Sequence, residues 1–155
     1  MRASPAVVVD PVMIVDSAHN PAGMAASMAA VTEAFGFGAL EAVLAISADK
    51  DVVGILAEME PVVSTLVATQ NSASRSMDAD ELARLAVEVF GPDRVMAVPR
   101  LDDAIDTATS LADEAEAEDG PGLGGAGILI TGSTATAGEA RTLLGAPGIA
   151  GQVAE

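Results

Sequence analysis

The sequence contains no cysteine, tryptophan or tyrosine, and it has only seven basic residues against 23 acidic ones. Without cysteine, the chain can form no disulfides, thiol nucleophiles or thiolate metal sites. One histidine and no cysteine predict no metal site of the zinc type. The net charge of −16 argues against binding to nucleic acid or to an anionic membrane surface, because both need basic patches.

Long hydrophobic runs are also lacking. Half of the residues are apolar, but they occur in short runs, and none approaches the roughly 20 residues of a membrane span. Residues 1–10 lack the hydrophobic stretch and cleavage pattern of a secretion signal. We therefore expect one cytoplasmic domain over residues 1–155, with a core of Val, Ile, Leu, Met and Ala.

Short β-branched runs alternate with stretches of helical period. This alternation predicts an α/β, Rossmann-like domain of three layers (α/β/α) with a mostly parallel sheet of five or six strands. Ala6–Val9 is either a sixth strand or an extension of the first. The other predicted strands are Val12–Val15, Ala42–Ile46, Thr65–Thr69, Arg94–Val98 and Gly127–Thr131.

Helices are predicted between the strands from their capping residues. Asn20 before Pro21 favours a first helix, along which Met24, Met28 and Val31 recur on one face. A second helix is predicted from Asp51 to about Glu60, capped by Asp49, and a third over Glu81–Phe90, opened by a capping box of Asp78 and Glu81. A fourth helix has the inner stripe Leu101, Ile105, Ala108 and Leu111, and a surface loop is predicted over Ala115–Gly125. The last helix is predicted over Ala140–Leu144, opened by a capping box of Thr136 and Glu139.

Four polar loops follow predicted strands, so they should meet at the carboxyl edge of the sheet. They span residues 16–21, 47–51, 70–75 and 132–136, and they hold the only histidine, His19, and the only lysine, Lys50. Polar loops on a buried sheet favour a binding site. The sequence has no GxxxxGK[ST] phosphate loop, and the glycine-rich residues 120–127 precede a strand instead of following one.

The first of these loops suggests contacts with a nucleotide. Asp16 ends a buried strand, where its carboxylate could accept hydrogen bonds from a ribose. His19 lies beside a helix amino terminus, which favours an anion. The structural alternative is that Asp16 and Asn20 are turn and cap residues and that His19 is a surface imidazole.

The later loops offer groups for a substrate carboxylate. Lys50 could bind such a carboxylate, or it could form a solvated ion pair with Asp49 or Asp51 worth under about 1 kcal/mol. Ser133 could donate to the same carboxylate or cap a helix. Arg75 could bind phosphate or brace its own loop.

The segment VDSAHNPAG (residues 15–23) closely resembles the D-[GAS]-A-H-N-P motif of folylpolyglutamate synthases and bifunctional dihydrofolate synthases, which belong to the Mur ligase superfamily. Three further motifs of that family follow in the same order, so the resemblance covers Val12 to Leu144. They are Ala48–Asp51, then Thr69 with Arg75–Met77 and Glu81–Ala83, and finally Thr131–Ser133 with Gly138–Arg141.

The resemblance implies a carboxy-terminal domain that is inactive alone and closes onto an amino-terminal P-loop ATPase domain absent from residues 1–155. ATP would be contacted by Asp16 at the ribose, by His19 near the phosphates and by Asn20. Glutamate would be held through its carboxylate by Lys50 and Ser133. This chain would supply no catalytic residue and no metal ligand, and Mg would be held mainly by the absent domain.

The resemblance also implies the reaction and the partners of the parent enzyme. A carboxylate of folate or dihydropteroate, bound by the absent domain, would become an acyl phosphate at the expense of ATP. The amine of L-glutamate would then attack it.

Two features depart from the family pattern. The P-G-R-L-E hinge that supplies an ATP-contacting arginine is missing, and Val7–Asp10 is echoed by Met13–Asp16. A second hypothesis is a stand-alone nucleotide- or amino-acid-binding regulatory module of the same fold. A third, a phosphoacceptor signalling domain, is disfavoured because the chain lacks paired acidic residues after the first strand and a lysine after the last.

Overall fold

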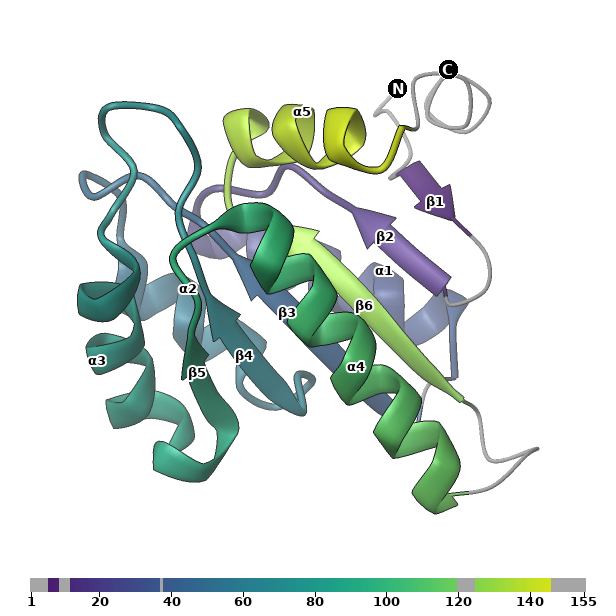
Figure 1. The fold of residues 1–155 in the computed structure, drawn as a ribbon. Coiled ribbons are helices and arrows are strands. Elements are labelled where there is room, and N and C mark those ends of the chain that lie inside the picture. The colour runs from purple at the N-terminus through teal and green to yellow at the C-terminus, as the bar shows by residue number, and fades with distance from the viewer. Residues whose placement is uncertain (1–5, 9–11, 37, 120–124, 146–155) are drawn as a thin grey trace.

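The computed structural model describes residues 6–8, 12–36, 38–119 and 125–145. In these residues a six-stranded sheet lies between helices (Figure 1), in the order β1-β2-β6-β3-β4-β5. β1 is antiparallel to β2 and all other neighbours are parallel. The predicted α/β class with a mostly parallel sheet is confirmed. The strands are β1 (Ala6–Val8), β2 (Val12–Val15), β3 (Ala39–Leu44), β4 (Thr65–Ala68), β5 (Val95–Ala97) and β6 (Ala126–Thr131).

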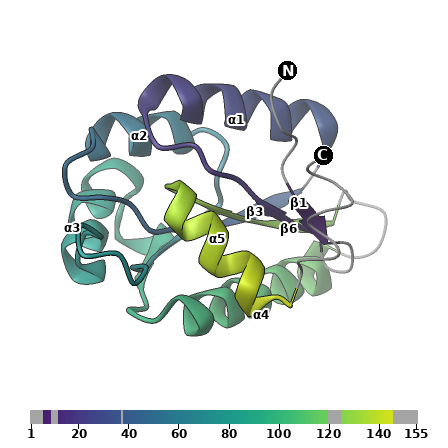
Figure 2. The same ribbon diagram turned by 90° about the horizontal axis from the view of Figure 1, so that it is seen from above.

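Helices cover both faces of the sheet, as the view from above shows (Figure 2). Buried side chains of α1, α2 and α3 join one apolar cluster, and those of α4 and α5 join a second cluster across the sheet. The sheet therefore separates two cores. The helices are α1 (Pro21–Ala34), α2 (Val52–Met59), α3 (Ala79–Phe90), the 3-10 turn η1 (Pro92–Arg94), α4 (Leu101–Asp119) and α5 (Thr134–Leu143).

The loops that leave neighbouring strands at the centre of the sheet lead to opposite faces. β6 lies between β2 and β3. The chain leaves β2 and β3 toward α1 and α2 on one face, but it leaves β6 toward α5 on the other. In doubly wound folds, ligands bind in the crevice that such a divergence opens beyond the carboxyl ends of the strands.

Several capping predictions are confirmed. Asn20 is the N-cap of α1, and Asp78 is the N-cap of α3. For α2 the prediction was wrong: Asp51, not Asp49, is its N-cap, with Oδ1 accepting the Gly54 N–H at 3.0 Å. Asp49 is engaged elsewhere, because its Oδ1 accepts the Ser47 hydroxyl at 2.6 Å.

Two further boundaries differ from the predictions. α5 begins at Thr134 with Ser133 as its N-cap, so the predicted capping box of Thr136 and Glu139 is wrong. α4 extends to Asp119, beyond the start of the loop predicted from Ala115. The helix continues because Ala112 and Ala115 prolong its apolar stripe against the second core. Residues 120–124 of that predicted loop lie outside the described residues.

One carboxylate lies inside the sheet, near the amino ends of the strands. Glu41 on β3 is 3% exposed, and its Oε1 has no hydrogen-bond partner among the described residues. Burial raises the pKa of Glu41 above its usual 4.5, and a hydrogen bond with Thr65 opposes the shift. The folded state therefore disfavours the charged form, so stability falls as pH rises through the folded pKa. Below about 4.5 both states are protonated and the penalty disappears.

We expect Glu41→Gln to raise the melting temperature at pH 7, with each 1 kcal/mol appearing as about 2–4 °C in a domain of this size. The gain should shrink as the pH is lowered from 7 to about 4.5, where the penalty for burying the charged form disappears. Thermal melts at pH 7 and at about pH 4.5 measure this. Glu41 and Glu114 line one recess, and Glu114 is exposed on α4. The substitution Glu114→Gln therefore controls for the change in net charge. Equal gains for the two variants at both pH values would contradict the prediction.

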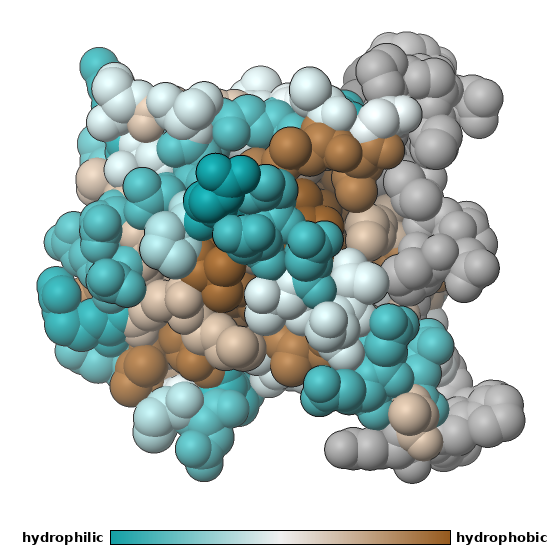
Figure 3. All heavy atoms as spheres, viewed as in Figure 1, coloured by the Kyte–Doolittle hydropathy of each residue, from teal (hydrophilic) through white to brown (hydrophobic). Residues whose placement is uncertain are grey.

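Few large apolar side chains are exposed in the described part of the chain, and each lies on a different helix or strand. Figure 3 shows the face covered by α4 and α5, where apolar atoms gather between the two helices. Among the described helices, none combines the length and apolar character that crossing a membrane requires. The exposed large apolar residues are Val53, Val87, Met96 and Leu143.

Candidate functional site

The carboxyl ends of the parallel strands form one rim, and backbone hydrogen bonds carry the strand pairing into its loops. The Asp16 N–H donates to the Ile130 carbonyl at 2.9 Å, and the Ala45 N–H donates to the Thr131 carbonyl at 3.2 Å. The loops after β2, β3 and β6 therefore start side by side, as the sequence predicted.

Asp16 ties together three elements of this rim. Its Oδ2 accepts the Ala18 N–H at 3.0 Å, the Ser27 hydroxyl at 2.9 Å and the Thr131 hydroxyl at 3.0 Å. These bonds join β2 to α1 and to the end of β6. No hydrogen bond from the described residues reaches Oδ1, so this oxygen can accept from a ligand.

Asp16, His19 and Asn20 line a recess with a volume of about 230 Å³. The His19 Nδ1 lies 3.0 Å from the Ser17 carbonyl oxygen. A carbonyl can only accept, so Nδ1 is the donor, and Nε2 is left to a ligand or solvent. Asn20 Oδ1 accepts the Gly23 N–H at 2.7 Å, so Asn20 acts as the cap that one interpretation of the sequence assigned to it.

Gly132 lets the loop after β6 approach β3 closely. Its φ is +127°, a conformation that other residues rarely adopt, and a Cβ there would collide with the Ala45 carbonyl oxygen. The glycine thus fixes how near α5 begins to the end of β3.

Lys50 is exposed in the turn before α2, and no ion pair joins its side chain to an acid in the described part of the chain. The neighbouring Asp49 instead pairs with Arg75, whose Nη1 lies 3.5 Å from Asp49 Oδ2 in an exposed position. The hydrogen bond from Ser47 lowers the pKa of Asp49, with smaller contributions that include Lys50 and Arg75. This exposed ion pair joins the loop after β4 to the loop after β3, while Lys50 has no ion-pair partner among the described residues.

Ser133 lies at the start of α5, where its Oγ accepts the Thr136 N–H at 3.0 Å. It lines a second recess together with Ser47, Arg75 and Ser76. Lys50 is not among the residues that line this recess. The structure therefore groups Ser133 with Arg75 more closely than with Lys50.

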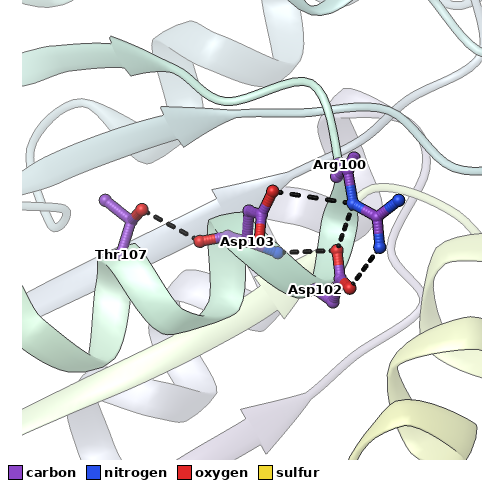
Figure 4. A network of polar contacts seen from close by, with 4 residues as sticks. All are labelled: Arg100, Asp102, Asp103 and Thr107. Atoms are coloured by element: carbon purple, nitrogen blue, oxygen red, sulfur yellow. Dashed lines mark hydrogen bonds and ion pairs between the residues drawn. The ribbon is translucent and has the colours of Figure 1, made fainter.

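A third cation of the rim region is paired with acidic residues in the first turn of α4. Arg100 precedes α4, and its Nε and Nη2 donate to the Asp102 carboxylate at 3.1 and 2.6 Å, with Asp103 Oδ2 at 3.6 Å (Figure 4). This contact raises the pKa of Arg100 and lowers that of Asp102. Arg100 therefore offers no uncompensated charge to a ligand.

Sequence reasoning missed four polar residues that organise the rim: Ser27, Asn71, Thr131 and Thr136. Ser27 could have been found, because it shares the inward face of α1 with Met24. Thr136 was interpreted as a cap, yet it is fully buried, and its hydroxyl donates to the Ala45 carbonyl at 2.7 Å. No three His, Asp or Glu side chains gather as metal ligands in the described residues.

The fold and the rim define an α/β domain with a doubly wound sheet and two polar recesses at its carboxyl edge. The family described as Mur ligase, glutamate ligase domain, matches residues 3–134. The chain belongs to this family, which confirms the resemblance in its motifs.

The chain is 49% identical over 138 residues to the dihydrofolate synthase/folylpolyglutamate synthase of Mycobacterium tuberculosis. The match covers 87% of this chain and 28% of that protein. The structure of M. tuberculosis folylpolyglutamate synthase complexed with ADP has a TM-score of 0.86 and 47% identity, over 92% of this chain and 32% of that one. A Thermotoga maritima folylpolyglutamate synthase shares the fold, with a TM-score of 0.73 and 21% identity over 94% and 31% of the two chains.

Proposed function

We propose that residues 1–155 form the single glutamate-ligase domain of an ATP-dependent folate–glutamate ligase. The chain spans only 28% of its M. tuberculosis relative, so in this proposal the rest of the enzyme supplies the P-loop ATPase domain, the magnesium site and the folate pocket. The domain works by closing onto that larger part. A cytoplasmic location remains a prediction.

One observation carries the proposal. The family match over residues 3–134 includes the first three loops of the rim and residues 132–134 of the fourth, and the relative at 49% identity is a dihydrofolate synthase/folylpolyglutamate synthase. A similar fold alone would leave the substrate open, because one fold serves many functions.

For the nucleotide, we assign Asp16 to the ribose, His19 to the phosphates and Asn20 to the support of their loop. The geometry supports these roles, because Asp16 Oδ1 and His19 Nε2 are left without partners by the hydrogen bonds of the described residues. The amino terminus of α1 next to His19 favours an anion. A solved structure of the M. tuberculosis relative contains ADP.

For glutamate, we assign the α-carboxylate to Lys50 and Ser133. Lys50 is the cation of the rim without an ion-pair partner among the described residues, whereas Arg75 and Arg100 are engaged with aspartates. Ser133 is the N-cap of α5. Because Lys50 does not line the recess that Ser133 and Arg75 border, the assignment requires a carboxylate that lies between this recess and the turn that carries Lys50.

The chemistry would take place in two steps at the interface of the two parts. A folate carboxylate attacks the γ-phosphate of ATP, releasing ADP and forming an acyl phosphate. The neutral amine of glutamate then attacks the acyl carbon, the C–O bond to phosphate breaks, and the amine proton is lost as the amide forms. The residues of this chain bind and orient the two small substrates.

A chimera tests the proposal directly. This chain would replace the matching segment of the M. tuberculosis relative. We expect ADP release that depends on both glutamate and a reduced folate, well above that of the relative truncated before the segment. A chimera that binds ATP and folds cooperatively, yet releases no ADP in response to glutamate, would contradict the proposed function.

A further inference from the structure

A buried polar cluster connects the second recess to three separate segments of the chain. Asn71, after β4, is 9% exposed, and Thr136 on α5 is fully buried. Asn71 Nδ2 donates to Thr136 Oγ1 at 2.9 Å and reaches Ser133 Oγ at 3.4 Å. Ser133 Oγ and Thr136 Oγ1 lie 2.9 Å apart. The cluster thus surrounds the hydroxyl that we assign to glutamate.

The direction of each hydrogen bond in this cluster follows from the number of protons. Thr136 Oγ1 must donate its single proton to the Ala45 carbonyl at 2.7 Å, because a carbonyl only accepts. In its contact with Ser133, Thr136 is therefore the acceptor and Ser133 is the donor. The orientation of the Asn71 amide follows from its oxygen, because Oδ1 accepts the Ala73 N–H at 2.8 Å. The NH2 group therefore faces Thr136 and Ser133.

The proton of Ser133 consequently points inward, toward Thr136, and not into the recess. To donate to a carboxylate, the Ser133 hydroxyl must rotate away and leave a buried acceptor on Thr136. Leaving such an acceptor empty is unfavourable. Asn71 prevents this loss, because its Nδ2 continues to donate to Thr136 Oγ1 after Ser133 has turned.

The geometry points to Asn71 as a positioning residue that releases the Ser133 hydroxyl for the carboxylate of the amino-acid substrate. This inference rests on the proposed role of Ser133. A second contact holds the Asn71 loop in place: Glu139 Oε2 on α5 accepts the backbone N–H of Ser72 at 2.7 Å. Asn71 therefore acts on the substrate through Ser133 and Thr136, from a fixed position.

The substitutions Asn71→Leu and Asn71→Asp together isolate this role. Both remove the amide donors; Leu adds no charge, whereas Asp keeps the acceptor for Ala73 and the shape of the side chain but adds a negative charge. In the chimera we expect Asn71→Leu to raise the KM for glutamate about tenfold, the effect of losing one ordinary hydrogen bond, and Asn71→Asp to raise it at least as much, because its charge also repels the substrate carboxylate. The KM for ATP and kcat should stay within about twofold.

Gln70→Glu is the matched control. It makes the same change of amide to carboxylate on the same loop, where Gln70 Oε1 accepts the Ala79 N–H at 2.9 Å. Its KM for glutamate should remain at the wild-type value. A purely structural role for Asn71 would instead lower the melting temperature and change the ATP and glutamate constants together, which would overturn the inference.

A titration of the isolated chain keeps the test independent of the chimera. Glutamate at tens of millimolar should shift the amide resonances of Ser133 to Thr136 in the wild type, and the shift should be lost in Asn71→Asp. Equal shifts in both proteins would refute the role of Asn71. No shift in either protein would refute the role of Ser133 on which it rests, whereas an inactive chimera would count against the proposed function itself.

Discussion

The isolated chain is expected to release no ADP when it is supplied with ATP, magnesium, glutamate and a reduced folate. Phosphoryl transfer needs backbone amides, a lysine and a metal ion around the β- and γ-phosphates, and residues 1–155 contain no GxxxxGK[ST] motif. Asp16 and His19 border only an open recess at the rim. Coupled assays of ADP and phosphate release measure the rate, and the chimera serves as the positive control.

The same preparation should bind ATP weakly, with a Kd of roughly 1 mM or higher, which corresponds to a binding free energy no more favourable than about −4 kcal/mol. The few donors of one open recess cannot replace the contacts made after closure onto a second domain. Calorimetry measures the Kd. Turnover above blank would contradict the fragment proposal, and micromolar affinity without turnover would favour the stand-alone regulatory module.

Replacing Lys50 by alanine in the chimera is expected to raise the KM for glutamate about ten- to a hundredfold and to leave that for ATP nearly unchanged. A hydrogen bond to a charged group contributes about 1.5–3 kcal/mol, which corresponds to this range. The effect should be specific to glutamate because the nucleotide recess at Asp16 and His19 does not include Lys50. Steady-state kinetics with each substrate varied in turn measure it.

Lys50→Arg should restore only part of the affinity, because the planar guanidinium is larger and directs its donors differently. Arg84→Ala is the matched control: it removes an exposed cation from α3, where Arg84 lies 3.9 Å from Glu81. Its glutamate KM should equal that of the unmodified chimera. If Lys50→Ala behaves like this control, Lys50 is a solvated surface charge and its assignment is wrong.

The sequence by itself determined the class of fold, because local chemistry decides most of it. Continuous apolar runs such as Val12–Val15 are buried on both faces of a parallel sheet, and that run is β2 as predicted. Asn20 and Asp78 cap helices through bonds to N–H groups two or three residues away, so their role depends on nearby residues alone. The order of the four motifs was sufficient to identify the family, and the family match over residues 3–134 confirms this identification.

Only the tertiary structure determined which side chains of the rim form hydrogen bonds with one another. The contacts that orient its side chains join residues far apart in sequence: Asp16 meets Thr131 across 115 positions, and Asn71 meets Thr136 across 65. A local pattern assigns Thr136 to a capping box, yet packing of α5 against the end of β3 buries it and turns its proton to Ala45. Side-chain direction at this edge depends on where two helices dock on opposite faces of one sheet, and no spacing within a single loop specifies that.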